Sequence, residues 1–111
     1  MVRRGDVVIA TIGGGIGNKP RPAVIIQEDD FGSTETVLMI PFTSDIPAIL
    51  VSRPYFEPNI ETGLNQPCVL MVDKLLPVRR KSIGEIIGQL STADMERVER
   101  ALLIMLGIAR G

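Results

Sequence analysis

Residues 6–27 read DVVIATIGGGIGNKPRPAVIIQ, and this stretch decides the fold class. Two runs rich in β-branched residues, 6–12 and 23–27, flank a glycine-rich segment and two prolines. Short β-branched runs bounded by glycine and proline are typical of strands. The stretch therefore predicts two strands joined by a loop. Pro20 and Pro22 stiffen the chain and hold Arg21 extended just before the second strand.

The pattern of short strands continues toward the C-terminus. Three more apolar runs predict strands, at residues 36–42, 68–75 and 83–90. The proline-rich part between them, residues 46–66, is expected to hold short edge strands and loops. Gly84 and Gly88 mark bends or bulges in the last strand.

The last segment changes period. A serine at position 91, with Asp94 three residues later, fits a helix N-cap. One apolar stripe at helical spacing follows, made of Met95, Val98, Leu102 and Met105. Gly107 is the expected helix stop. The sequence thus predicts one domain, residues 1–111, of mainly β class: a small barrel with a C-terminal α-helix packed on it.

Composition limits the kind of protein this is. The chain has 111 residues, of which 45% are hydrophobic and 23% charged, which suits one compact domain. No apolar run approaches the ~20 residues of a bilayer span, and no signal peptide is evident, so we expect a cytoplasmic protein without membrane association. The only cysteine, Cys68, excludes an internal disulfide and is expected to be buried in a strand. Because the chain lacks histidine, His-based triads and His-ligated zinc are excluded.

Charge is distributed unevenly along the chain. The net charge of −1 argues against nucleic-acid binding by bulk positive charge. Residues 1–27 nevertheless carry four basic side chains and one acidic one. Residues 28–62 carry one basic and seven acidic side chains, and residues 63–111 carry seven basic and five acidic ones. Either a basic face forms where the two ends of the chain meet, or these blocks are ordinary surface charge.

Several residues are candidates for a functional site. Arg21 and Thr43 each lie at the edge of a predicted strand beside a loop, where barrels usually place their chemistry. The run Arg79-Arg80-Lys81 is either a solvated turn or a contact to a phosphate backbone. Tyr55 and Phe56 would either stack on bases or belong to the core.

Seven blocks in order resemble the MazF/PemK family of toxin endoribonucleases. They are Arg4-Gly5-Asp6-Val7-Val8; Lys19-Pro20-Arg21-Pro22-Ala23-Val24-Ile25-Ile26; Phe42-Thr43-Ser44-Asp45; Gly63-Leu64 with Pro67; Met71-Val72-Asp73-Lys74; Ile83-Gly84 with Ile87-Gly88-Gln89-Leu90-Ser91; and the helix running to Ala101-Leu102 and Leu106-Gly107. The resemblance implies an SH3-like barrel with a C-terminal helix, a homodimer that cleaves single-stranded RNA without a metal or other cofactor. It also implies a cognate antitoxin whose acidic C-terminal tail occupies the RNA groove.

The resemblance also implies roles for particular residues. Arg21 and Thr43 carry over as the catalytic pair, and Ser44 helps to hold the phosphate. The other expected RNA-binding residues are Asn18, Lys19, Asp73, Lys74, Arg79 and Arg80. The sequence departs from the pattern in the first loop, where many members have Gly-Ser-Glu-Gln or Gly-His-Glu-Gln. Met71 stands where one branch has an arginine, which favours a structural or base-contacting role for Asp73 over a catalytic one.

The chemistry fits this set of residues. RNA cleavage can use the substrate's own 2′-hydroxyl as nucleophile and leave a 2′,3′-cyclic phosphate, so the protein must supply positioning and charge stabilisation. A guanidinium forks onto two phosphate oxygens and stays charged, and a threonine hydroxyl can donate to the same phosphate. The proton of the 2′-hydroxyl would go to water or to a carboxylate such as Asp73. The alternative is a non-enzymatic gyrase poison of the CcdB type on the same fold, and a scaffold without activity ranks third.

Overall fold

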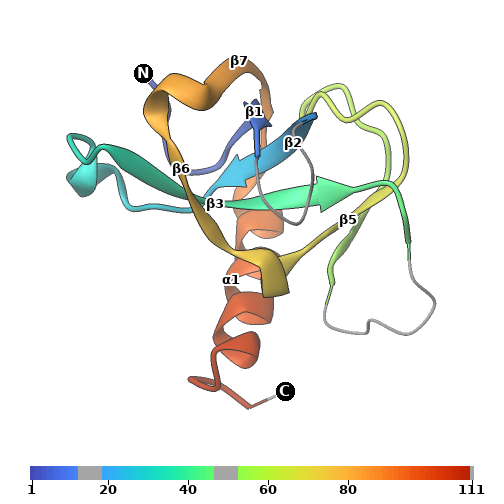
Figure 1. Cartoon of the computed structure of the whole chain (residues 1–111). Coiled ribbons are helices and arrows are strands. Elements are labelled where there is room, and N and C mark those ends of the chain that lie inside the picture. Colours follow the sequence, from blue (N-terminus) through green and yellow to red (C-terminus); the bar gives the residue numbers. More distant parts are fainter. Residues whose placement is uncertain (13–18, 47–52, 111) are drawn as a thin grey trace.

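An antiparallel sheet bent into a half-barrel, with one helix across it, makes up the fold (Figure 1). The computed structural model describes residues 1–12, 19–46 and 53–110. The strands are β1 (Asp6–Thr11), β2 (Pro20–Ile25), β3 (Thr36–Thr43), β4 (Tyr55–Phe56), β5 (Cys68–Leu70), β6 (Leu76–Arg79) and β7 (Ile83–Gln89), followed by the helix α1 (Thr92–Met105). Short 3₁₀ turns lie at Asp29–Phe31, Val72–Lys74 and Arg80–Ser82. The predicted mainly β fold with a C-terminal helix is confirmed.

The central strands of the sheet are apolar on both faces because each face packs into a core of its own. The hydrogen-bonded order is β4-β5-β3-β2-β1-β7, and β6 also pairs with β3. Alternate residues of β1, β2 and β3 enter two separate cores, as expected for the two-residue period of a strand. The core beneath α1 includes Val7, Val24, Ile40, Phe42, Leu70 and Val98, and the core on the other face includes Val8, Ala10, Ala23, Ile25, Val37 and Met39.

Helix α1 begins and ends as the sequence predicts. The Ser91 side chain accepts a hydrogen bond from the backbone N–H of Asp94 at 3.1 Å, which is the expected N-cap. Gly107 follows the helix with a φ of +74°, the left-handed conformation of a glycine stop. The apolar stripe is buried at its start only: Met95 and Val98 are buried, whereas Met105 is exposed. No helix in the described ranges is long and apolar enough to cross a membrane.

The predicted strand at residues 68–75 is wrong as a single element. The chain pairs first as β5 with Phe42 and Thr43, then turns, then pairs as β6 with residues 36–39 of the same strand. The turn is held because the Met71 N–H donates to the Pro41 carbonyl at 2.9 Å. The turn accommodates residues 71–75, which lie between the two segments that pair with β3. Strand β2 also begins earlier than predicted, at Pro20, because residues 20–24 pair with β1.

The turn at residues 59–64 is locked against β7. Gly63 has a φ of +75°, and a Cβ there would lie 2.2 Å from the Ile87 carbonyl oxygen. A Cβ on Gly88 would lie 2.3 Å from the backbone of Thr62, so the two glycines permit one close approach of two backbones. The register between β1 and β7 shifts beside Gly88, which confirms the bulge expected in this strand.

Candidate functional site

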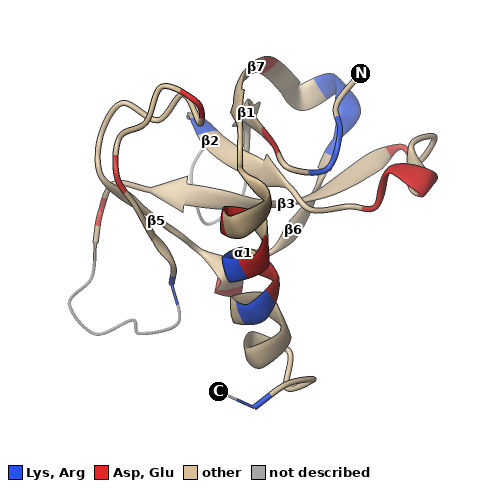
Figure 2. Cartoon of the chain, turned by 180° about the vertical axis from the view of Figure 1, so that it is seen from behind, with Lys and Arg blue, Asp and Glu red and all other residues tan. Residues whose placement is uncertain are grey.

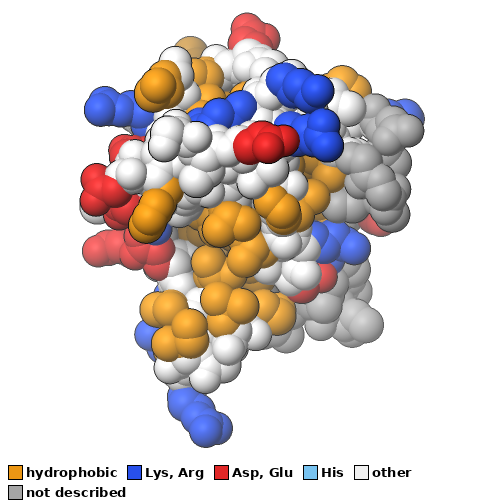
Figure 3. Space-filling model, turned by 60° about the vertical axis from the view of Figure 1, so that its left-hand side comes forward, with side chains coloured by type: hydrophobic (Ala, Val, Ile, Leu, Met, Phe, Trp, Pro, Cys, Tyr) orange, Lys and Arg blue, Asp and Glu red, His pale blue; other side chains and the backbone are white. Residues whose placement is uncertain are grey.

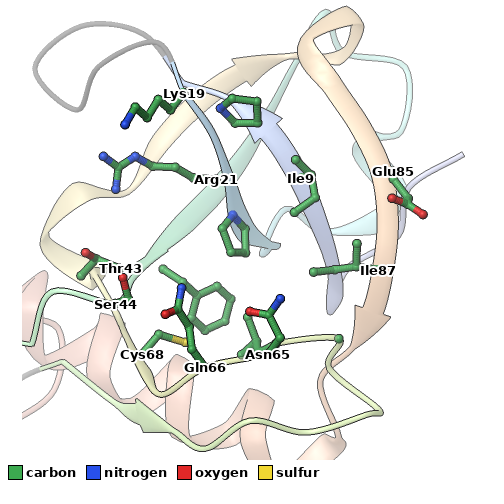
Figure 4. Close-up of a pocket in the computed structure, with 15 residues that line it drawn as sticks. Ile9, Lys19, Arg21, Thr43, Ser44, Asn65, Gln66, Cys68, Glu85 and Ile87 are labelled. Carbon is green, nitrogen blue, oxygen red and sulfur yellow. The ribbon is translucent and has the colours of Figure 1, made fainter.

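A pocket of about 700 Å³ opens where β2 and β3 part (Figure 4). The registered pairs between these strands end at Ala23 and Pro41. The same register, continued by two residues, sets Arg21 opposite Thr43. Both of these residues line the pocket; the others that line it are Ile9, Lys19, Pro20, Pro22, Phe42, Ser44, Gly63, Leu64, Asn65, Gln66, Cys68, Glu85 and Ile87.

One end of the pocket is cationic and rich in hydroxyls. Figure 4 shows Lys19, Arg21, Thr43 and Ser44 together at this end, with the Arg21 guanidinium on the same side of the strand ends as the Thr43 hydroxyl. The Thr43 Oγ1 accepts a hydrogen bond from the backbone N–H of Asp45 at 3.1 Å. Because that bond uses a lone pair, the hydroxyl hydrogen stays available to donate. This end can therefore bind an anion and donate to it.

The floor of the pocket is apolar and contains the cysteine. Cys68 is 4% exposed, and burial raises the pKa of its thiol to about 11. The thiol therefore stays protonated near neutral pH and is a poor nucleophile. The prediction of a buried strand cysteine is confirmed. Phe42 packs edge-to-face on Phe56 at a centroid distance of 5.4 Å, so Phe56 belongs to the core, while Tyr55 is exposed.

Two amide side chains in the pocket were missed at the level of the sequence. Asn65 and Gln66 follow the locked turn and line the pocket between its two ends. Glu85 lies at the far end, on β7. The sequence offers only a weak signal for these two residues, an Asn-Gln pair between Gly63-Leu64 and Pro67. Adjacent polar residues are common in such a segment.

Asp73 lies outside this pocket and has a partner within the chain. Its carboxylate accepts from Nε and Nη2 of Arg53 at 2.8 and 2.9 Å, and the Arg53 side chain is 8% exposed. The hydrogen bond from Arg53 lowers the pKa of Asp73, although burial opposes this. A carboxylate with a lowered pKa is a weak proton acceptor, and this one is used to tie the turn before β6 to the segment before β4.

The other predicted RNA-binding residues are also spread over the molecule. Lys74, Arg79 and Arg80 are not among the described residues that line the pocket of Arg21. The Arg80 guanidinium donates to the carbonyl oxygens of Phe31 and Thr34, which leaves it holding the loop before β3. Asn18 lies outside the described residues.

Residues of the first and last charge blocks lie near each other at a place other than the pocket of Arg21. Arg3 and Arg80 line a common hollow near the N-terminus together with Glu28 and Asp29, so this hollow carries both signs of charge (Figure 2). Within residues 1–12, 19–46 and 53–110, no group of three or more acidic, cysteine or histidine side chains is placed so that it could hold a metal ion.

Comparison with known proteins identifies the family. A sequence model of the PemK-like, MazF-like toxins of type II toxin–antitoxin systems matches residues 3–106. The chain belongs to this family. It is 46% identical over 109 residues to a probable endoribonuclease MazF of Mycolicibacterium smegmatis, covering 97% of this chain and 99% of the relative.

Solved structures of PemK/MazF proteins share the fold. The Mycobacterium tuberculosis toxin MazF-mt6 matches with a TM-score of 0.79 and 22% identity, covering 94% of this chain and 98% of that one. A mycobacterial endoribonuclease in complex with its cognate antitoxin matches with a TM-score of 0.80 and 19% identity, over 100% of both chains. The predicted family and fold are confirmed.

Proposed function

We propose that this PemK/MazF family member is the endoribonuclease toxin of a toxin–antitoxin system, and that it cleaves single-stranded RNA in a sequence-specific, metal-independent reaction. The observation that carries the proposal is the meeting of Arg21 and Thr43 in one pocket, beside Lys19 and Ser44. One relative reported above is named a probable endoribonuclease and one solved structure an endoribonuclease, and neither supports the gyrase-poison alternative.

In the proposed reaction the RNA supplies the nucleophile. The 2′-hydroxyl attacks the adjacent phosphorus, the bond to the 5′-oxygen of the next nucleotide breaks, and a 2′,3′-cyclic phosphate and a 5′-hydroxyl remain. Arg21 forks onto two phosphate oxygens, and its charge stabilises the charge that builds up in the transition state. Thr43 donates its hydroxyl hydrogen to the same phosphate, while Lys19 and Ser44 hold it. Water takes the 2′-hydroxyl proton, since Asp73 is engaged by Arg53 outside the pocket, and water gives a proton to the departing 5′-oxygen.

The proposed partners follow from the surface of the molecule. Hydrophobic side chains gather on one face of the molecule (Figure 3). The exposed large hydrophobic residues include Leu38 on β3, Leu103 and Met105 on α1, and Leu106 and Ile108 just after α1. An exposed apolar patch of this kind supports a homodimer. The cationic end of the pocket supports binding of an acidic antitoxin tail in place of RNA. A location in the cytoplasm, where mRNA is present, completes this proposal.

Contacts to flanking nucleotides form a separate part of the proposal. Lys74 and Arg79 are exposed, and we assign them to phosphates of the RNA beyond the scissile step. Phosphate contacts of this type weaken steeply with salt. Asp73 and Arg80 are held by partners within the chain, and we assign them the positioning of the segments beside that RNA. Asn18 precedes Lys19 directly, so we assign it to the same RNA strand.

The test is RNA cleavage in the presence of EDTA by the wild type and matched variants. We expect Arg21→Ala and Thr43→Ala to lower the rate about 10²–10³-fold each, the usual cost of one such donor. Arg21→Lys keeps the charge but loses the fork, and should remain well below the wild type. Arg100→Ala, which removes an exposed charge on α1 outside the pocket, is the control and should cut normally. Intact RNA after prolonged incubation with the folded wild type would sink the proposal.

A further inference from the structure

We propose that Asn65 and Gln66 select the base that is accepted next to the scissile phosphate. This inference rests on the proposed endoribonuclease function and adds the residues that give it specificity. Both side chains are exposed, both line the pocket of Arg21, and neither carries a charge.

The charges in the pocket orient a bound nucleotide. Lys19 and Arg21 lie at one end and Glu85 at the other, as Figure 4 shows. The negative charge of a nucleotide is on its phosphate, which is attracted to the first end and repelled from the second. The base then extends from the cationic end into the middle of the pocket, where the amides lie.

The middle of the pocket suits a base. In Figure 4, Gln66 lies on the side of Ser44 and Asn65 on the side of Ile87. The neighbouring Pro22 and Ile87 give an apolar surface for the flat faces of the ring, while each amide offers one acceptor and two donor hydrogens to its edge. Single-stranded RNA is recognised in this way, by hydrogen bonds to the edges of splayed-out bases. The volume of about 700 Å³ is within the range of ligand pockets, ~300–1,000 Å³.

The backbone that carries the amides is fixed. The Gly63 N–H donates to the Asn59 carbonyl at 2.9 Å, and the Gln89 N–H donates to the Glu61 carbonyl at 2.9 Å. The Thr62 hydroxyl, in a side chain that is 3% exposed, accepts from the Leu64 N–H at 3.3 Å. A preorganised recognition group loses less entropy on binding and discriminates more sharply than a free loop.

The experiment compares cut-site patterns. A long RNA would be incubated with the wild type or with one of four variants, and the cuts would be mapped by primer extension. The variants are Asn65→Ala, Gln66→Ala and the near-isosteric Asn65→Asp and Gln66→Glu. Glu96→Gln, on an exposed position of α1, is the matched control. Circular dichroism checks that each variant is folded, and the isosteric variants keep the test valid if an alanine variant unfolds. The kcat/KM values on two oligonucleotides that differ only at the base beside the cut give the discrimination.

We expect the pocket variants to cut at new sites and to lose about 5- to 150-fold in discrimination, the range for a good amide–base contact. Glu96→Gln should keep the wild-type pattern. Folded pocket variants that cut RNA with the wild-type pattern and discrimination would overturn this inference and leave the proposed function intact. A folded wild type that cuts no RNA would overturn the proposed function instead.

Discussion

Replacing Gly63 by alanine tests the close approach of the 59–64 turn to β7, which positions Asn65 and Gln66 in the pocket. The φ of +75° alone costs a non-glycine residue about 1–2 kcal/mol. The new Cβ would also lie 2.2 Å from the oxygen and 2.8 Å from the carbon of the Ile87 carbonyl, and both are backbone atoms. Relief requires the turn to move off β7, which breaks the hydrogen bond from Gln89 to Glu61 and loosens the buried Leu64. We expect a total loss of about 3–5 kcal/mol in the free energy of unfolding.

Gly107 offers a matched control for this change. Its φ of +74° is nearly the same, but nothing lies within 4 Å of a Cβ built there. Gly107→Ala should therefore cost only about 1–2 kcal/mol, the strain of the left-handed conformation. Urea unfolding followed by circular dichroism would measure both variants, and the difference between them isolates the steric clash. Equal losses for the two variants, within about 0.5 kcal/mol, would refute the reasoning.

Three further predictions concern the thiol, the ion pair and the helix cap. Native Cys68 should resist alkylation near pH 8 on a timescale that labels the denatured chain fully, because burial raises its pKa to about 11; rapid labelling of the folded protein would contradict this. Arg53→Ala should cost about 1 kcal/mol at neutral pH. Arg53 lowers the folded-state pKa of Asp73 below its ordinary 3.8, so this stabilisation is present above that pH and fades as the pH falls through the folded value. Urea unfolding should therefore show a smaller difference in the free energy of unfolding between wild type and Arg53→Ala at pH 3 than at pH 7. The same difference at both pH values would count against the pair. Ser91→Ala should lose about 1 kcal/mol through the missing bond from Asp94, whereas an unchanged thermal midpoint would show that the cap is dispensable.

Local signals in the sequence were enough to predict most elements of the fold. The β-branched run after Asp6, the proline-bounded second strand and the capped helix from Ser91 each depend on neighbouring residues. The break between β5 and β6 was not predictable in this way. It arises because both segments pair with β3, and a pairing between residues 43 and 69 is invisible to a local pattern.

The candidate site shows the same division. Arg21 and Thr43 follow from strand ends and from the family resemblance, and the register between β2 and β3 explains why they share a pocket. Asp73 was expected to contact RNA, but it forms a bidentate pair with Arg53, which is 20 residues away in the sequence. No local pattern around either residue predicts this pair. Asn65 and Gln66 line the pocket because Gly63 and Gly88 let the 59–64 turn pack on β7, which is far from it in the sequence.

The most direct test of the central claim is a double-mutant cycle on Arg21 and Thr43. Single-turnover cleavage rates would be measured in EDTA for the wild type, both single alanine variants and the double variant, on one labelled oligonucleotide. If both side chains act on the same phosphate, their effects are coupled, and the double variant should be only slightly slower than the slower single variant. Losses that multiply independently, or a folded Arg21→Ala that cuts at the wild-type rate, would contradict the account.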